Sequence, residues 1–143
     1  MISKDIIPLS ALQTNKSNQL SISNNNPKFY ITANDYIIYD NIVFYICEVG
    51  ISNNKNDVLI KHVKLRYSRL YDLYQYLLKH YSKVHKFRPF PPKKILWNGT
   101  KECAEERLPI LNLFLSELTT IYNLINDYTF RKYLMLNDIN DKC

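Results

Sequence analysis

The feature that most constrains the fold is a strand that passes directly into a helix near the middle of the chain. Residues 58–67 read as a β-strand, and a helical pattern begins at Ser68 with no loop between them. From there apolar residues recur at three- and four-residue spacing, with Ser68 placed to cap the first turn. We therefore expect the apolar residues of this stripe to lie in the core: Leu70, Leu73, Tyr74, Leu77, Leu78 and Tyr81.

Two further strands precede this junction. From Lys28 onward the chain is rich in β-branched and aromatic side chains, and the polar pair Asp40-Asn41 separates two such runs. Both residues tolerate left-handed backbone angles, so the pair predicts a hairpin turn. The polar stretch Ser52–Asp57 predicts a second turn before the third strand. The three runs together predict an antiparallel meander.

The third strand ends in an arginine and a tyrosine. Because side chains alternate along a strand, Arg66 shares a face with Lys64, and Leu65 points the opposite way. A guanidinium grips phosphate oxygens with paired hydrogen bonds, and a phenol ring packs against a flat ligand. Arg66 and Tyr67 therefore suit an anion carried on a ring. Taken alone, such a pair is more often a surface arginine beside a packed aromatic residue.

The segment 83–97 mixes prolines and cations with large apolar side chains. Such a loop suits a membrane interface, where rings enter the headgroup region and lysines meet lipid phosphates. We expect Leu96 and Trp97 to fold back into the core. The direction of Phe87 and Phe90 stays open, and if they point outward they are the residues predicted to insert into a membrane.

The last third of the chain predicts two more helices. Pro109 fits the first turn of a helix, because proline has no backbone N–H to lose there, and this places Arg107 near the helix N-terminus. An apolar stripe from Leu111 to Ile125 continues that helix. A short final helix over residues 130–136 completes the packing.

Composition excludes several classes of protein. With only two glycines, Gly50 and Gly99, the chain has no glycine-rich nucleotide-binding loop. Its cysteines, Cys47, Cys103 and Cys143, have no zinc-like spacing, so we expect free thiols and no metal. No paired carboxylates or nucleophile-and-base arrangement stands out, so we expect neither an enzyme nor a bound cofactor. No apolar run reaches the roughly 18 residues of a membrane span, which favours a cytoplasmic protein.

The net charge of +6 implies an anionic partner, which charge alone does not identify as nucleic acid or phospholipid. Three motifs in order narrow the choice. Arg66-Tyr67-Ser68 precedes a helix, Phe90-Pro91-Pro92-Lys93-Lys94 forms a loop, and Arg107 opens a later amphipathic helix. In this order and spacing they resemble the phox-homology (PX) domain, a phosphoinositide-binding module, over about residues 28–136.

The resemblance implies an α+β fold, in which a three-stranded antiparallel meander packs against three to four helices. It also implies roles for single residues. Arg66 would bind the 3-phosphate of the lipid and Tyr67 would pack on the inositol ring. Lys93, or else Lys94, would contact the phosphate that joins inositol to glycerol. Arg107 would hydrogen-bond the 4- and 5-hydroxyls of the ring.

Two positions depart from the family pattern. Leu65 stands where a basic residue is usual, and Arg69 stands where an acidic one is usual. We expect Ser68 and Arg69 to be additional phosphate contacts, which leaves a strict preference among phosphoinositides open. The resemblance implies a phosphatidylinositol 3-phosphate-binding module that recruits the protein to endosomal or vacuolar membranes as a trafficking or membrane-contact adaptor.

Two alternatives remain, a basic nucleic-acid-binding domain and a protein-interaction adaptor with a degenerate lipid site. Outside the domain, residues 1–27 form a Ser- and Asn-rich segment that predicts a disordered tail. Its short apolar patch, residues 6–12, is a candidate contact for a protein partner. Residues 137–143 predict a flexible C-terminal tail.

Overall fold

The computed structural model describes residues 27–52, 57–94 and 96–137, so the two predicted tails lie almost wholly outside the described residues. Its strands form one antiparallel sheet in sequence order: β1 (Lys28–Tyr39), β2 (Ile42–Ser52) and β3 (Val58–Arg66). The helices that follow are α2 (Tyr67–Tyr81), α3 (Lys101–Glu117), η2 (Leu118–Thr120), η3 (Leu124–Asn126) and α4 (Tyr128–Tyr133). This arrangement confirms the predicted α+β fold class.

The sheet follows the predicted meander. Asp40 and Asn41 have φ angles of 54° and 63°, and they form the turn between β1 and β2. Along β3, Val63 and Leu65 are buried while Arg66 is exposed, as the alternation predicts. The sheet therefore presents Arg66 away from the core at the point where α2 begins.

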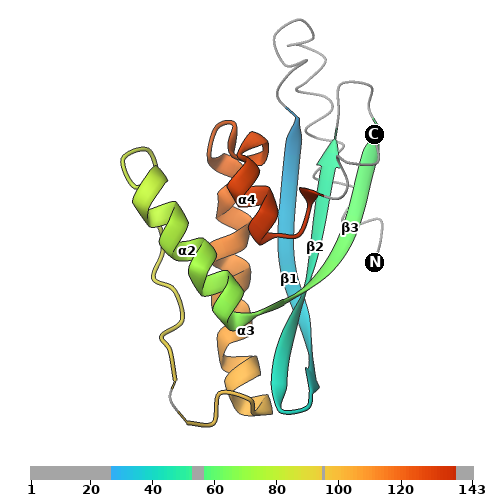
Figure 1. Ribbon diagram of the computed structural model, residues 1–143, viewed down its shortest axis with the longest axis vertical. Helices are drawn as coiled ribbons and strands as arrows, with labels where there is room; N and C mark the ends of the chain where they lie inside the picture. Colours follow the sequence, from blue (N-terminus) through green and yellow to red (C-terminus); the bar gives the residue numbers. More distant parts are fainter. Residues whose placement is uncertain (1–26, 53–56, 95, 138–143) are drawn as a thin grey trace, which may run out of the picture.

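The helices pack on one side of the sheet, and α3 runs alongside β1 (Figure 1). At a bulge in β1, the backbone N–H of Ala33 donates to the Asn112 side chain over 2.8 Å, which fixes α3 to the strand. In α2, Leu70, Leu73 and Leu77 are fully buried, whereas the rest of its predicted stripe is only partly buried.

Both long helices begin earlier than predicted. The N-cap of α2 is Arg66, with no side-chain capping bond, so Ser68 lies inside the helix. The N-cap of α3 is Thr100, whose hydroxyl accepts a hydrogen bond from Cys103 N over 3.2 Å. Pro109 thus lies in the helix interior and Arg107 in its second turn, because a good cap outweighs the preference of proline for a first turn.

Asp127 fastens α4 to α2. Its carboxylate accepts hydrogen bonds from the hydroxyls of Tyr76 and Tyr81, at 2.8 and 2.6 Å, and from Phe130 N at 3.1 Å. Asp127 thereby starts α4 at Tyr128 and not near residue 130. Burial raises the pKa of Asp127, but the hydrogen bonds from Tyr81, Tyr76 and the backbone outweigh it and lower the pKa overall.

We expect Asp127→Asn to lower the free energy of unfolding at pH 7 by about 1–2 kcal/mol, since it weakens hydrogen bonds to a charged group. Because the folded-state pKa is lowered, this contribution is complete above the unfolded pKa of about 3.9 and is lost as pH falls through the folded-state value. Urea unfolding at pH 7 and pH 3 measures it. A difference between variant and wild type that is as large at pH 3 as at pH 7 would contradict this role.

Candidate functional site

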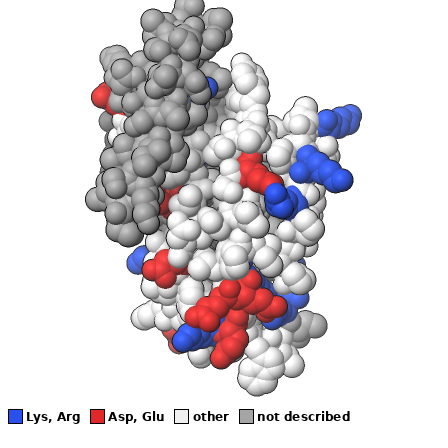
Figure 2. Space-filling model, turned by 180° about the vertical axis from the view of Figure 1, so that it is seen from behind, with Lys and Arg blue, Asp and Glu red and all other residues white. Residues whose placement is uncertain are grey.

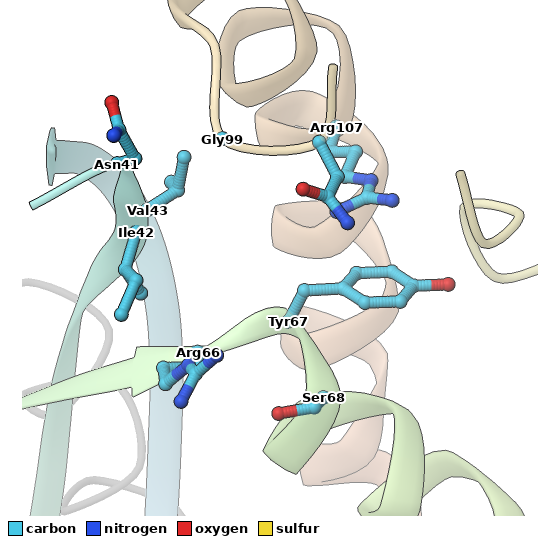
Figure 3. Close-up of a pocket in the computed structure, with 9 residues that line it drawn as sticks. Asn41, Ile42, Val43, Arg66, Tyr67, Ser68, Gly99 and Arg107 are labelled. Carbon is cyan, nitrogen blue, oxygen red and sulfur yellow. The ribbon is translucent and has the colours of Figure 1, made fainter. Parts of the chain in front are cut away.

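A hollow of about 220 Å³ lies where the sheet meets the helices (Figure 3). Arg66, Tyr67 and Ser68 enter it from the junction of β3 and α2, and Arg107 enters it from α3. The β1–β2 turn and the loop before α3 close the other sides, with Asn41, Ile42, Val43, Asn98 and Gly99. The structure therefore brings together three of the predicted binding residues and Ser68.

Arg66 is exposed at the mouth of this hollow and takes the N-cap position of α2. Within the described residues its guanidinium has no hydrogen bond and no ion pair. The first turn of α2 has neither a side-chain cap nor an acidic residue. Its backbone N–H groups and the positive end of the helix dipole are thus available to an anion beside Arg66.

Tyr67 and Arg107 form a stacked pair. The guanidinium carbon of Arg107 lies 3.7 Å from the centre of the Tyr67 ring. The loop of Pro91 and Pro92 holds both residues. Pro91 O accepts from the Tyr67 hydroxyl over 2.5 Å, and Pro92 O accepts from Arg107 Nη2 over 3.3 Å. Arg107 is only 4% exposed, so its guanidinium is surrounded by protein and is held by Tyr67 and Pro92.

A second hollow of about 210 Å³ adjoins the first and shares Tyr67, Ser68, Asn98 and Arg107 with it. Its remaining lining residues are Tyr71, Asp72, Lys93 and Lys94. Lys93 Nζ lies 4.3 Å from the centre of the Tyr71 ring. Lys94 instead forms an ion pair with Glu106 over 2.5 Å, and this hydrogen bond raises the pKa of Lys94. The charge of Lys94 is therefore already paired with a carboxylate, whereas Lys93 contacts an uncharged aromatic ring.

Arg69, which was predicted as an additional phosphate contact, lies outside both hollows. Its Nε donates to Tyr133 O over 2.8 Å and its Nη2 to Lys132 O over 3.0 Å. These carbonyls belong to the last turn of α4, where a cation is favoured by the helix dipole. Arg69 thus joins the start of α2 to the end of α4.

Phe87 and Phe90 turn inward, so the structure contradicts their placement as membrane-inserting residues. The Phe90 ring centre is 4.8 Å from that of Tyr74 and 5.2 Å from that of Phe114. Phe87 also packs against Phe114, at 6.4 Å. Both rings are partly buried against the core, because aromatic side chains of α2 and α3 offer ring faces to this loop.

Leu96 and Trp97, which sequence analysis placed in the core, are instead 67% and 76% exposed. Their loop touches the β1–β2 turn, since a Cβ added at Gly99 would lie 2.1 Å from Asn41 O. Tyr39, just before that turn, is 73% exposed. Three large exposed side chains therefore gather at the end of the molecule that bears the first hollow.

Asn41, Asn98 and Gly99 also line the first hollow, although the sequence pattern did not predict them there. The scarcity of glycine was the available signal for Gly99, because a glycine in such a chain marks a close backbone approach. Cys47 and Cys103 are buried free thiols, and neither lines the two hollows. Cys143 lies outside the described residues.

In a comparison with known families, the family model described as PX domain matches residues 53–137. The matched region begins shortly before β3, runs to the end of the described residues and includes all four residues predicted to bind the headgroup. No curated protein matches the chain. Across the described ranges, no helix has the length and apolar character needed to cross a bilayer.

Proposed function

Because this chain belongs to the PX family of phosphoinositide-binding modules, we propose that it binds phosphatidylinositol 3-phosphate and thereby attaches to endosomal or vacuolar membranes. The observation that carries this proposal is Arg66 at the uncapped N-terminus of α2. An exposed guanidinium beside free backbone N–H groups suits one phosphate group closely. Ser68, in the same first turn, adds a hydroxyl.

The rest of the headgroup fits the two adjoining hollows. With the 3-phosphate at Arg66, the inositol ring lies near Tyr67 and Arg107. Arg107 covers one face of Tyr67, so the inositol ring reaches that face only if the outer guanidinium edge moves toward the ring hydroxyls. Such a movement lets Arg107 donate to the 4- and 5-hydroxyls, which disfavours lipids phosphorylated there.

We assign the phosphate that joins inositol to glycerol to Lys93 and not to Lys94. Both lysines line the second hollow. Lys94 is already paired with Glu106, and moving it to a phosphate would leave that carboxylate without its partner. Lys93 rests on an aromatic face, a contact of about 0.5–1 kcal/mol at an exposed site, which a phosphate readily outcompetes.

The membrane contact follows from the exposed edge formed by Tyr39, Leu96 and Trp97, beside the first hollow. Large apolar and aromatic side chains enter the interfacial region of a bilayer. On the face shown in Figure 2, acidic residues gather toward this same end. Asp35, Glu102 and Glu105 lie around the Tyr36 hydroxyl, which donates to Glu105 over 3.0 Å. We expect that face to turn away from an anionic surface.

Headgroup recognition makes and breaks no covalent bond, and PX domains are typically non-catalytic, so we propose a binding module and not an enzyme. We retain a trafficking or membrane-contact adaptor as its cellular role. A protein partner that binds the N-terminal segment stays a prediction, since residues 1–26 lie outside the described residues.

Co-sedimentation with vesicles tests the proposal. Vesicles of neutral lipid are prepared with one added phosphoinositide each, either singly or multiply phosphorylated. Binding of the protein to each kind of vesicle, and to oligonucleotides, is measured at low and at raised salt. We expect the strongest retention with phosphatidylinositol 3-phosphate, and retention that survives raised salt. Stronger binding to doubly phosphorylated lipids would contradict the specificity. Binding only to oligonucleotides favours the nucleic-acid alternative, and binding to neither favours the adaptor with a degenerate site.

A further inference from the structure

Three buried side-chain polar atoms in the described chain have no hydrogen-bond partner, and two of them belong to residues that interact electrostatically with each other. These two are the Tyr45 hydroxyl and Arg107 Nε. Tyr45 is fully buried on the inward face of β2, where it pairs with Leu65 of β3. A buried donor left without a partner destabilises the folded state, so a buried donor and acceptor that both lack partners need an explanation.

The other contacts of Arg107 do not use Nε. The guanidinium stacks on Tyr67, and Nη2 donates to Pro92 O on the loop side. The Tyr45 side chain is fully buried, and its hydroxyl lies within the electrostatic influence of the same guanidinium. Burial raises the pKa of Tyr45 to about 12, and the nearby charge of Arg107 opposes this rise. The phenol thus stays neutral at physiological pH.

We propose that Tyr45 is a positioning residue for Arg107, whose Nε–H donates to the phenol oxygen and fixes the inner end of the guanidinium. The inference rests on the proposed function, in which the outer edge of Arg107 reads the ring hydroxyls. A neutral acceptor suits this role better than a carboxylate, because it orients the guanidinium without matching its charge. Lys94, held by Glu106, shows the opposite arrangement in the neighbouring hollow.

Tyr45→Phe removes this acceptor while it keeps the ring that fills the core. Tyr36→Phe is the matched control. Tyr36 pairs with Tyr45 across β1 and β2, and its hydroxyl donates to Glu105, not to the pocket. Both variants lose one hydroxyl from the same part of the sheet. Only Tyr45→Phe is expected to affect Arg107.

The first measurement needs no lipid. In spectra of ¹⁵N-arginine-labelled protein, the Arg107 Nε–H signal is identified by its loss in Arg107→Ala. We expect it to be protected from solvent exchange in the wild type and in Tyr36→Phe, and to shift and exchange faster in Tyr45→Phe. An unchanged Arg107 signal in Tyr45→Phe overturns the inference, whatever the protein binds.

The second measurement is titration with soluble short-chain phosphatidylinositol 3-phosphate. We expect Tyr45→Phe to weaken binding about tenfold, the effect of one hydrogen bond to a charged group, and Tyr36→Phe to leave it unchanged. In the Arg107→Ala background, Tyr45→Phe should cause no further loss. A full additional loss there would mean that Tyr45 acts on the fold and not through Arg107. Wild-type protein that binds no headgroup would refute the proposed function alone, since the spectra still decide the role of Tyr45.

Discussion

Arg66→Ala is expected to weaken binding to phosphatidylinositol 3-phosphate vesicles by about 100-fold or more, because it removes a charge-assisted fork from the phosphate. The fold should survive, since Arg66 is exposed and packs against no core residue. Arg66→Lys should also bind poorly, because an ammonium group does not reproduce the planar fork. Vesicle co-sedimentation measures the loss, and circular dichroism verifies the fold.

The matched control for this prediction is Arg69→Ala. Arg69 is also an exposed arginine in the first turn of α2, so its removal changes the net charge equally. Its guanidinium is engaged by the carbonyls of Tyr133 and Lys132. We expect a loss of about 1 kcal/mol in stability with little change in binding. A folded Arg66→Ala protein that still binds, or equal losses in both variants, would contradict the assignment of the phosphate to Arg66.

The strand-to-helix junction could be predicted from sequence because its signals are local. Alternation along β3 set the exposed face of Arg66, and the helical spacing after Ser68 placed the three leucines that are buried in α2. The start of α3 was predicted wrongly, because Pro109 is a visible signal while the cap at Thr100 takes effect through a hydrogen bond to Cys103. Both starts were allowed by the local sequence, and the capping hydrogen bond at Thr100 decides between them.

The direction of loop side chains could not be predicted, because it depends on contacts between segments far apart in the chain. Phe90 turns inward since Tyr74 and Phe114 offer ring faces on two different helices. Trp97 turns outward, at a residue with a φ angle of 64°, where its loop meets Asn41. Tyr45 reads as an ordinary inward strand residue, and its relation to Arg107 exists only in the folded chain.

Replacing the exposed loop residues should separate membrane insertion from headgroup capture. We expect Leu96→Ser combined with Trp97→Asn to weaken binding to vesicles by about 100-fold or more, since each buried side chain of this size contributes about 1.5–3 kcal/mol. Asparagine is chosen at position 97 because it tolerates the left-handed backbone angle there. Affinity for the soluble short-chain lipid should change by less than about twofold, because neither side chain lines the hollows.

Tyr122→Ser is the matched control, since Tyr122 is 79% exposed and adjoins Lys28, at the end of β1 far from the hairpin turn. It should leave both affinities unchanged.

The remaining vesicle binding of the double variant should fall steeply with salt. Apolar insertion is not screened by salt, and once it is removed only the electrostatic attachment is left. Phe87→Ser and Phe90→Ser should instead destabilise the fold, as their rings pack against Phe114. Equal losses of vesicle and soluble-lipid binding in the double variant would mean that this loop shapes the pocket and that other residues enter the bilayer.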